Sequence, residues 1–167
     1  ARAAGHANIE LRQGRLEALP VEDACADWVF SNCVINLAAD KNAVFAEIAR
    51  VLKPGGRLLI SDIVAEDLPD WVGMHADLYA ACLSGALSPA DYLRAAQEAG
   101  LHETRIVDTL RYDAAAIRQL VQEELPVALD ELAGRFGLSR KEMLDKAVAD
   151  LEGKITAIKL TGVKPVG

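Results

Sequence analysis

Three cysteines are the side chains of this sequence best suited to bond-forming chemistry. Cys25, Cys33 and Cys82 form no CxxC pair, and the chain begins without the pattern of a secretory leader, so we expect reduced thiols in a cytoplasmic protein. A thiolate is a nucleophile and a soft ligand, whereas a lone buried cysteine behaves as a small apolar residue. The three histidines have no spacing typical of a metal site. Each cysteine therefore has two roles open, ligand or packing residue.

Two loops could place ligand contacts beside one of these thiols. Gly14 to Glu17 and Asn32 to Asn36 each follow a predicted strand, and the second loop contains Cys33. In open parallel sheets ligands bind beyond the carboxyl ends of the strands, so we expect both loops on that edge. Cys25 precedes the strand that Cys33 follows, so the strand carries the two thiols to opposite edges of the sheet.

The elements that must position these loops follow an α/β pattern, in which short apolar runs alternate with amphipathic stretches. The run from Trp28 to Ser31 is continuously apolar up to its final serine, as expected for a strand buried on both faces of a parallel sheet. The predicted strands are Ile9 to Gln13, Trp28 to Ser31, Arg57 to Val64, Thr104 to Asp108 and Ile155 to Val163.

Helix signals lie between the predicted strands. Asp40 is placed to cap a helix that ends at Pro54-Gly55-Gly56, and Ser88 with Pro89 opens another that ends at Gly100. The region from about Pro69 to Leu83 is expected to be mostly helical. Residues 112–153 predict a helical insertion packed on its own domain, in which Ser139 to Glu142 forms a capping box.

Composition limits the partners of this chain. Its 167 residues are 51% hydrophobic and 26% charged, which fits a single domain. A net charge of −7 and a pI near 5.0 argue against broad binding of nucleic acid or of an anionic membrane. The longest uncharged run, Leu78 to Ala90, is too short to span a bilayer. We therefore expect a small-molecule or metalloid partner, no nucleic acid and no membrane.

Several stretches of the sequence resemble a known enzyme family. They read GRLEALP (14–20), SNCVINL (31–37), LKPGG (52–56), SDIV (61–64) and LYAACLSGAL (78–87). LKPGG before a predicted strand resembles class I methyltransferases that use S-adenosylmethionine, and the other stretches resemble the arsenite methyltransferases from about Asn8 to Asp108. The resemblance implies a Rossmann-like sheet flanked by helices. It also implies methyl transfer from S-adenosylmethionine to trivalent arsenic, as in arsenic detoxification.

The resemblance also implies site residues. Cys33 and Cys82 would bind the arsenic, and Cys25 would be structural or incidental. No catalytic acid or base is implied, because the arsenic lone pair is itself the nucleophile and needs only to be held in line with the methyl group. The residues implied to contact the cofactor are Gly14, Arg15, Leu16, Asn32, Cys33 and Val34.

The glycine-rich loop and the ribose-binding acid of the family are missing from this sequence. We therefore expect an N-terminally incomplete methyltransferase domain that lacks the first two strands of the family sheet. Its parts would be a core over residues 8–111, the helical insertion over 112–153 and a final strand over 154–164. A sheet edge left unpaired in this way could support a homodimer or a strand swap.

Two other functions stay open at this point. One is a methyltransferase for another small acceptor, such as a quinone ring carbon, in which Cys33 and Cys82 are packing residues. The other is an inactive fragment that only assembles with another chain.

Overall fold

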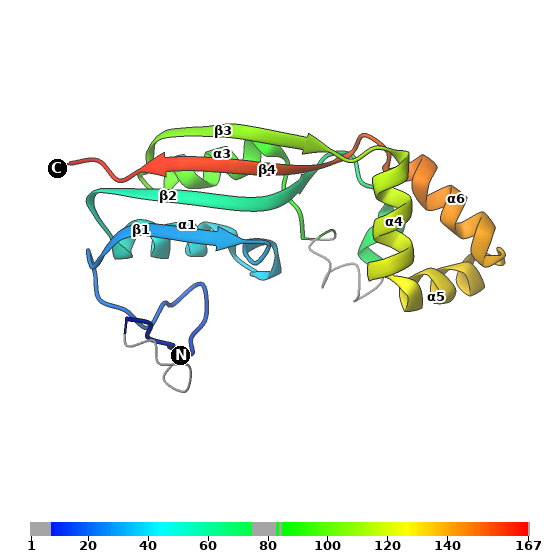
Figure 1. Ribbon diagram of the computed structural model, residues 1–167, viewed down its shortest axis with the longest axis horizontal. Helices are drawn as coiled ribbons and strands as arrows, with labels where there is room; N and C mark the ends of the chain where they lie inside the picture. Colours follow the sequence, from blue (N-terminus) through cyan, green and yellow to red (C-terminus); the bar gives the residue numbers. More distant parts are fainter. Residues whose placement is uncertain (1–7, 75–82, 84, 167) are drawn as a thin grey trace.

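The computed structural model describes residues 8–74, 83 and 85–166. Their central feature is a four-stranded sheet in the order β1-β2-β4-β3 (Figure 1). Strand β1 (Ala26–Asn32) is parallel to β2 (Leu52–Ala65), and β4 (Ile155–Val163) is antiparallel to both β2 and β3 (His102–Arg111). The α/β class predicted from the sequence is confirmed.

Two helices cover one face of this sheet and lie behind it in Figure 1. Helix α1 (Lys41–Val51) begins at Asp40, whose side chain accepts from the Ala43 amide, and α3 (Pro89–Glu98) begins in the same way at Ser88. Both caps were predicted. The core between helices and sheet is built from Ile35, Val44, Phe45, Ile48, Leu52, Leu58, Ile60, Val64, Tyr92, Ala96, Leu101, Ile158 and Leu160, among others.

The predicted glycine turn lies within the first residues of β2, shortly after α1 ends at Val51. Gly55 has a φ of 77°, a left-handed conformation that favours glycine. A side chain on Gly56 would lie 2.8 Å from the Lys53 carbonyl oxygen, so this position has no room for one. The turn allows the chain to reverse from α1 and to run back along the sheet.

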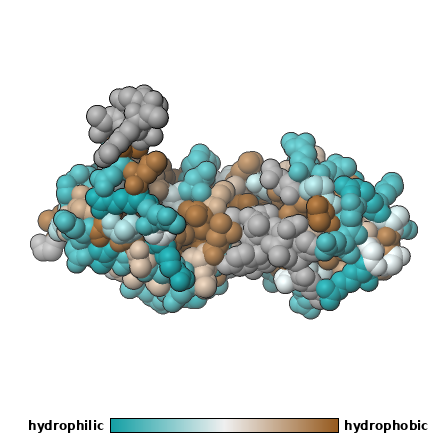
Figure 2. All heavy atoms as spheres, turned by 90° about the horizontal axis from the view of Figure 1, so that it is seen from below, coloured by the Kyte–Doolittle hydropathy of each residue, from teal (hydrophilic) through white to brown (hydrophobic). Residues whose placement is uncertain are grey.

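Three further helices lie beyond one end of the sheet (Figure 1). They are α4 (Ala114–Glu124), α5 (Pro126–Phe136) and α6 (Arg140–Leu151), in the stretch predicted to be helical, and α6 begins with the predicted capping box at Ser139. Together with Trp71, Val72 and Leu83 they form a second apolar core. The molecule is therefore elongated (Figure 1), and in the view of Figure 2 apolar patches near its middle and towards both ends interrupt a largely hydrophilic exterior.

The predicted strand from Ile9 to Gln13 is wrong. This segment is irregular and exposed, with 47% of Ile9 and 80% of Leu11 accessible to solvent. Alternation of apolar and polar residues gives an extended segment one apolar face, but a strand also needs a neighbouring strand to which its backbone can hydrogen-bond. Within residues 8–74, 83 and 85–166, β1 pairs only with β2, so this segment has no strand beside it.

The prediction that the Trp28 strand is buried on both faces is also wrong. β1 is an edge strand, and 48% of Trp28 and 68% of Phe30 are exposed. Their rings stack with centroids 5.4 Å apart, and the Arg57 guanidinium lies over Trp28 at 5.6 Å. The apolar run therefore has one face toward α1 and one face that the described residues leave open.

The region from Pro69 to Leu83 is described only in part. Asp70–Met74 forms a short 3-10 helix, η3, and most of the remaining stretch, including Cys82, lies outside the described residues. Among the described helices, none combines the length and the apolar character that crossing a membrane requires.

Candidate functional site

Cys33 lies directly after β1, at the end of the sheet where the parallel strands finish, as the sequence predicted. It is exposed, and its backbone amide donates to the Ser61 carbonyl of β2 at 2.9 Å. Its φ is +49°, a left-handed conformation that few residues other than glycine adopt. Ala24, Asp67 and Glu103 share this conformation, so the φ shows that the surroundings hold the turn at Cys33 and does not by itself mark a site.

Cys25 is not brought beside Cys33 in the described structure. Cys25 precedes β1, at the opposite end of the strand as predicted, and its amide donates to the Val51 carbonyl at 2.9 Å. It is exposed, so it is not a core packing residue. Cys82 lies outside the described residues, so its predicted approach to Cys33 stays a prediction.

A buried polar cluster lies beneath the segment that Cys33 begins. Asp62 of β2 is 1% exposed, and its Oδ1 accepts from Asn36 Nδ2 at 3.0 Å and from the Ile63 amide at 2.8 Å. Its Oδ2 accepts from the Tyr92 hydroxyl of α3 at 2.8 Å. Asn36, which lies in the 3-10 helix η2 (Ile35–Leu37), also donates to the Ile63 carbonyl at 2.6 Å. The carboxylate thus joins η2, β2 and α3.

The electrostatics of this cluster bear on the thiol. Burial raises the pKa of Asp62 above its ordinary value, although the hydrogen bonds from Ile63, Tyr92 and the η2 backbone act in the other direction. The pKa of Cys33 is also raised, first by partial burial of the thiol and second by the charge of Asp62. Cys33 is therefore held mainly as a thiol near neutral pH.

Asp62 and Tyr92 were not predicted as site residues from the sequence, and Asn36 was predicted only as the end of the loop that begins at Asn32. One local signal was present, because Asp62 is the single charged residue in the mostly apolar strand LLISDIV (58–64). Nothing local indicated that Tyr92, which is distant along the chain, donates to it.

The first predicted cofactor loop, Gly14 to Leu16, is described in full. A side chain on Gly14 would lie 2.5 Å from Pro20 Cδ, so packing against Pro20 accounts for this glycine without a ligand. Arg15 is exposed and makes an isolated bridge with Ala18, while Leu16 is partly buried against the sheet core. Leu16 is thus the residue of this loop that offers an apolar contact.

The second predicted cofactor loop begins with Asn32, Cys33 and Val34. Asn32 and Cys33 are exposed, and Val34 is partly buried just before η2. Leu16 and Val34 are thus the partly buried apolar side chains of the two predicted cofactor loops. The sequence contains no glycine-rich loop that could hold the methionine end of a nucleoside cofactor.

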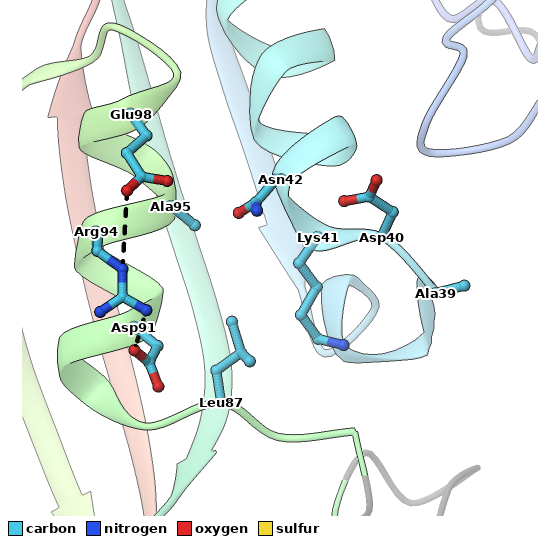
Figure 3. A pocket seen from close by; sticks show the side chains of 9 residues that line it. All are labelled: Ala39, Asp40, Lys41, Asn42, Leu87, Asp91, Arg94, Ala95 and Glu98. Carbon is cyan, nitrogen blue, oxygen red and sulfur yellow. Dashed lines mark ion pairs between the residues drawn. The ribbon is translucent and has the colours of Figure 1, made fainter.

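A groove of about 610 Å³ lies between the first turn of α1 and one side of α3 (Figure 3). Its charged groups are already used within the chain. Arg94 forms ion pairs with Asp91 and Glu98, Asp40 caps α1, and Lys41 donates to the Ala38 carbonyl. The groove therefore has the character of a solvated surface between two helices. In the part of the chain that the structure describes, no cluster of three histidine, cysteine or carboxylate side chains could hold a metal ion.

Comparison with known proteins gives the family. The model of the family described as "Methyltransferase domain" matches residues 1–100. The chain belongs to this methyltransferase domain family. The match includes both loops discussed above and Cys33, and it excludes the three helices α4 to α6.

The curated relatives of this methyltransferase domain include arsenite methyltransferases. That of Halobacterium salinarum is 43% identical over 100 residues, covering 59% of this chain and 26% of the relative. That of Homo sapiens is 38% identical over 104 residues, covering 60% and 28%. The matched part thus spans less than a third of the length of these relatives.

Solved structures extend the likeness beyond the matched sequence. An arsenic(III) S-adenosylmethionine methyltransferase from Chlamydomonas reinhardtii superposes with a TM-score of 0.64 at 31% identity, covering 93% of this chain and 44% of that one. A putative sarcosine dimethylglycine methyltransferase from Galdieria sulphuraria also has a TM-score of 0.64, at 26% identity, covering 99% and 63%. The fold is that of class I, Rossmann-like methyltransferases.

Proposed function

We propose that this chain is part of an S-adenosylmethionine-dependent enzyme that methylates trivalent arsenic, with Cys33 and Cys82 as thiolate ligands of the substrate. The observation that carries the proposal is the position of Cys33, an exposed thiol just past the carboxyl end of a parallel strand. Trivalent arsenic is soft and thiophilic, so such a thiol suits it. The names of the relatives agree with this substrate.

The chain contributes the substrate thiol and the contacts for one end of the cofactor. S-adenosylmethionine supplies an electrophilic methyl group when it is bound. Leu16, Asn32 and Val34 would contact its adenine end, while Cys33 would bind the arsenic and give up its thiol proton as the sulfur–arsenic bond forms. Holding the lone pair of arsenic in line with the methyl group needs no general base.

The alternative acceptor, such as a quinone ring carbon, receives less support. In that function Cys33 would be a packing residue, and an exposed residue at the end of an edge strand does not fill a core. Cys82 offers no observation for either function, since it lies outside the described residues. A role in arsenic detoxification and a cytoplasmic location stay predictions.

Thiol protection by arsenite tests the proposal on this chain. We expect preincubation with arsenite to protect Cys33 and Cys82 from N-ethylmaleimide, as measured by peptide mass spectrometry, and to leave Cys25 labelled. Arsenate serves as the control, because pentavalent arsenic does not bind thiolates and should protect none of the three. Equal labelling of Cys33 with and without arsenite would reject the proposed substrate.

We further propose that the chain associates with a second copy of itself through the outer edge of β1. Among the described residues, the outer edge of β1 has no neighbouring strand, and Trp28 and Phe30 are exposed beside it. Edges of this kind are templates for pairing with another strand.

Sedimentation analysis of the isolated chain tests this association. We expect a species heavier than the 17.9 kDa monomer that becomes more abundant with concentration. Phe30→Glu should shift the equilibrium to the monomer by placing charge at the edge, whereas Val107→Glu on the distant edge strand β3, which is 48% exposed, should not. A chain that is monomeric at all concentrations would contradict the proposal.

A further inference from the structure

Asp62 occupies a position that the strand pattern assigns to an apolar residue. Leu58, Ile60 and Val64 alternate with it on the face of β2 that α1 and α3 cover, and each of the three is 0% exposed. A carboxylate in such a row loses its hydration, and burial raises its pKa accordingly. Its presence therefore points to a requirement other than filling the core.

The hydrogen bonds of Asp62 indicate what this requirement is. Asn36, which binds its Oδ1, is 0% exposed and lies only three residues after Cys33. Ser61, the neighbour of Asp62 on β2, accepts from the Cys33 amide. Two consecutive residues of β2 thus hold both ends of the segment from Cys33 to Asn36, across the left-handed turn at Cys33.

Tyr92 fixes the carboxylate from the other side. Its hydroxyl donates to Asp62 Oδ2, and its ring, which is 0% exposed, packs edge-on against Phe45 with centroids 5.4 Å apart. Since both oxygens of Asp62 are engaged, the carboxylate has little freedom to turn away from Asn36.

We propose that Asp62 is a positioning residue for Cys33, which acts by holding Asn36 and thereby the turn that presents the thiol. Asp62 itself is buried and does not reach the substrate. Only the identity of the ligand that the thiol binds rests on the proposed function. The geometry that the proposal describes involves residues of this chain alone.

Two uncharged replacements of Asp62 separate its hydrogen bonds from its charge. Asn at position 62 can still accept from Asn36 and Ile63 through its oxygen, and its amide can donate to the Tyr92 hydroxyl. Ala can do neither. The readout is the rate at which iodoacetamide modifies Cys33, divided by the rate for Cys25 in the same molecule, because a general loss of stability raises both rates.

We expect this ratio to be about threefold to tenfold higher in Asp62→Ala than in Asp62→Asn, because a released turn frees the thiol from the partial burial that raises its pKa. This is the factor that one net hydrogen bond represents. The arsenite concentration that half-protects Cys33 should also be about tenfold higher in Asp62→Ala. Metal affinity falls by a similar factor when a ligand loses the residue that orients it by a hydrogen bond. Equal ratios in the two variants would overturn the proposal. If arsenite protects no cysteine of the unaltered chain, the proposed substrate is wrong, and the alkylation ratio still tests the positioning role.

Asn36→Ala provides the test if Asp62→Ala does not fold. It removes the link to the turn and leaves the charge of Asp62 in place, so any rise in the ratio reports positioning alone. We expect the same threefold to tenfold rise in the alkylation ratio, which is about the factor that one net hydrogen bond represents. A ratio equal to that of the unaltered chain would overturn the proposal.

Discussion

Cys33→Ser is expected to weaken arsenite binding by at least about 100-fold, because loss of a ligand costs more than the tenfold to 100-fold that follows loss of a ligand's hydrogen-bonding partner. Serine has nearly the shape of cysteine, but its hydroxyl is a hard donor with little affinity for trivalent arsenic. Its backbone can keep the amide hydrogen bond to Ser61. The measurement is titration with arsenite, followed by the protection of the remaining thiols.

Cys25→Ser is the matched control for this experiment. Cys25 is also exposed and is separated from Cys33 by the whole of β1, so its loss should leave arsenite affinity within about twofold, less than the effect of one net hydrogen bond. Equal losses in the two variants would show that arsenite binds the exposed thiols without a defined site. An unchanged affinity in Cys33→Ser would remove Cys33 from the site.

Elements with strong local signals were predicted well from the sequence. The bounds of β4 agree with the predicted strand, and the caps at Asp40, Ser88 and Ser139 mark the true beginnings of three helices. In each helix a side-chain oxygen satisfies a backbone amide within the next three residues, so the information lies within a few positions of the chain. Such signals do not depend on what packs around them.

The two incorrect strand predictions depend on neighbours that a local pattern does not specify. Ile9 to Gln13 alternates like a strand, but the described chain supplies no partner for it. The residues of β1 are apolar enough for a central strand, yet β1 lies at the edge with Trp28 and Phe30 exposed. Apolar runs show what a strand can bury, while its place in the sheet is decided by the other strands.

The candidate site was predictable to a similar extent. Cys33 follows a strand that the sequence indicates, and its place at the carboxyl end of the sheet was derived from that order alone. The cluster of Asp62, Asn36 and Tyr92 joins three elements that are far apart in the sequence, and only Asp62 broke a local pattern. Its role in the site becomes visible when the packing of α3 against β2 is known.

Phe45→Ala is expected to cost about 3–5 kcal/mol of unfolding free energy, as measured by urea denaturation. Phe45 is 0% exposed at the centre of the core between α1, α3 and the sheet, so alanine leaves a cavity there. The substitution also removes the edge-on contact with Tyr92, the residue that donates to Asp62. We therefore expect Cys33 to be alkylated faster in this variant, relative to Cys25, even under conditions in which the chain stays folded.

Phe136→Ala makes the same substitution where burial is incomplete. Phe136 is 41% exposed at the end of α5, in the part of the molecule that contains the second core, so its loss should cost less than about 1 kcal/mol. It should leave the relative alkylation rate of Cys33 unchanged, because the ring is not part of the core that contains Tyr92. Similar costs for the two variants would contradict the assignment of Phe45 to a tightly packed core. A Phe45→Ala variant with an unchanged Cys33 rate would show that Tyr92 holds Asp62 without support from this ring.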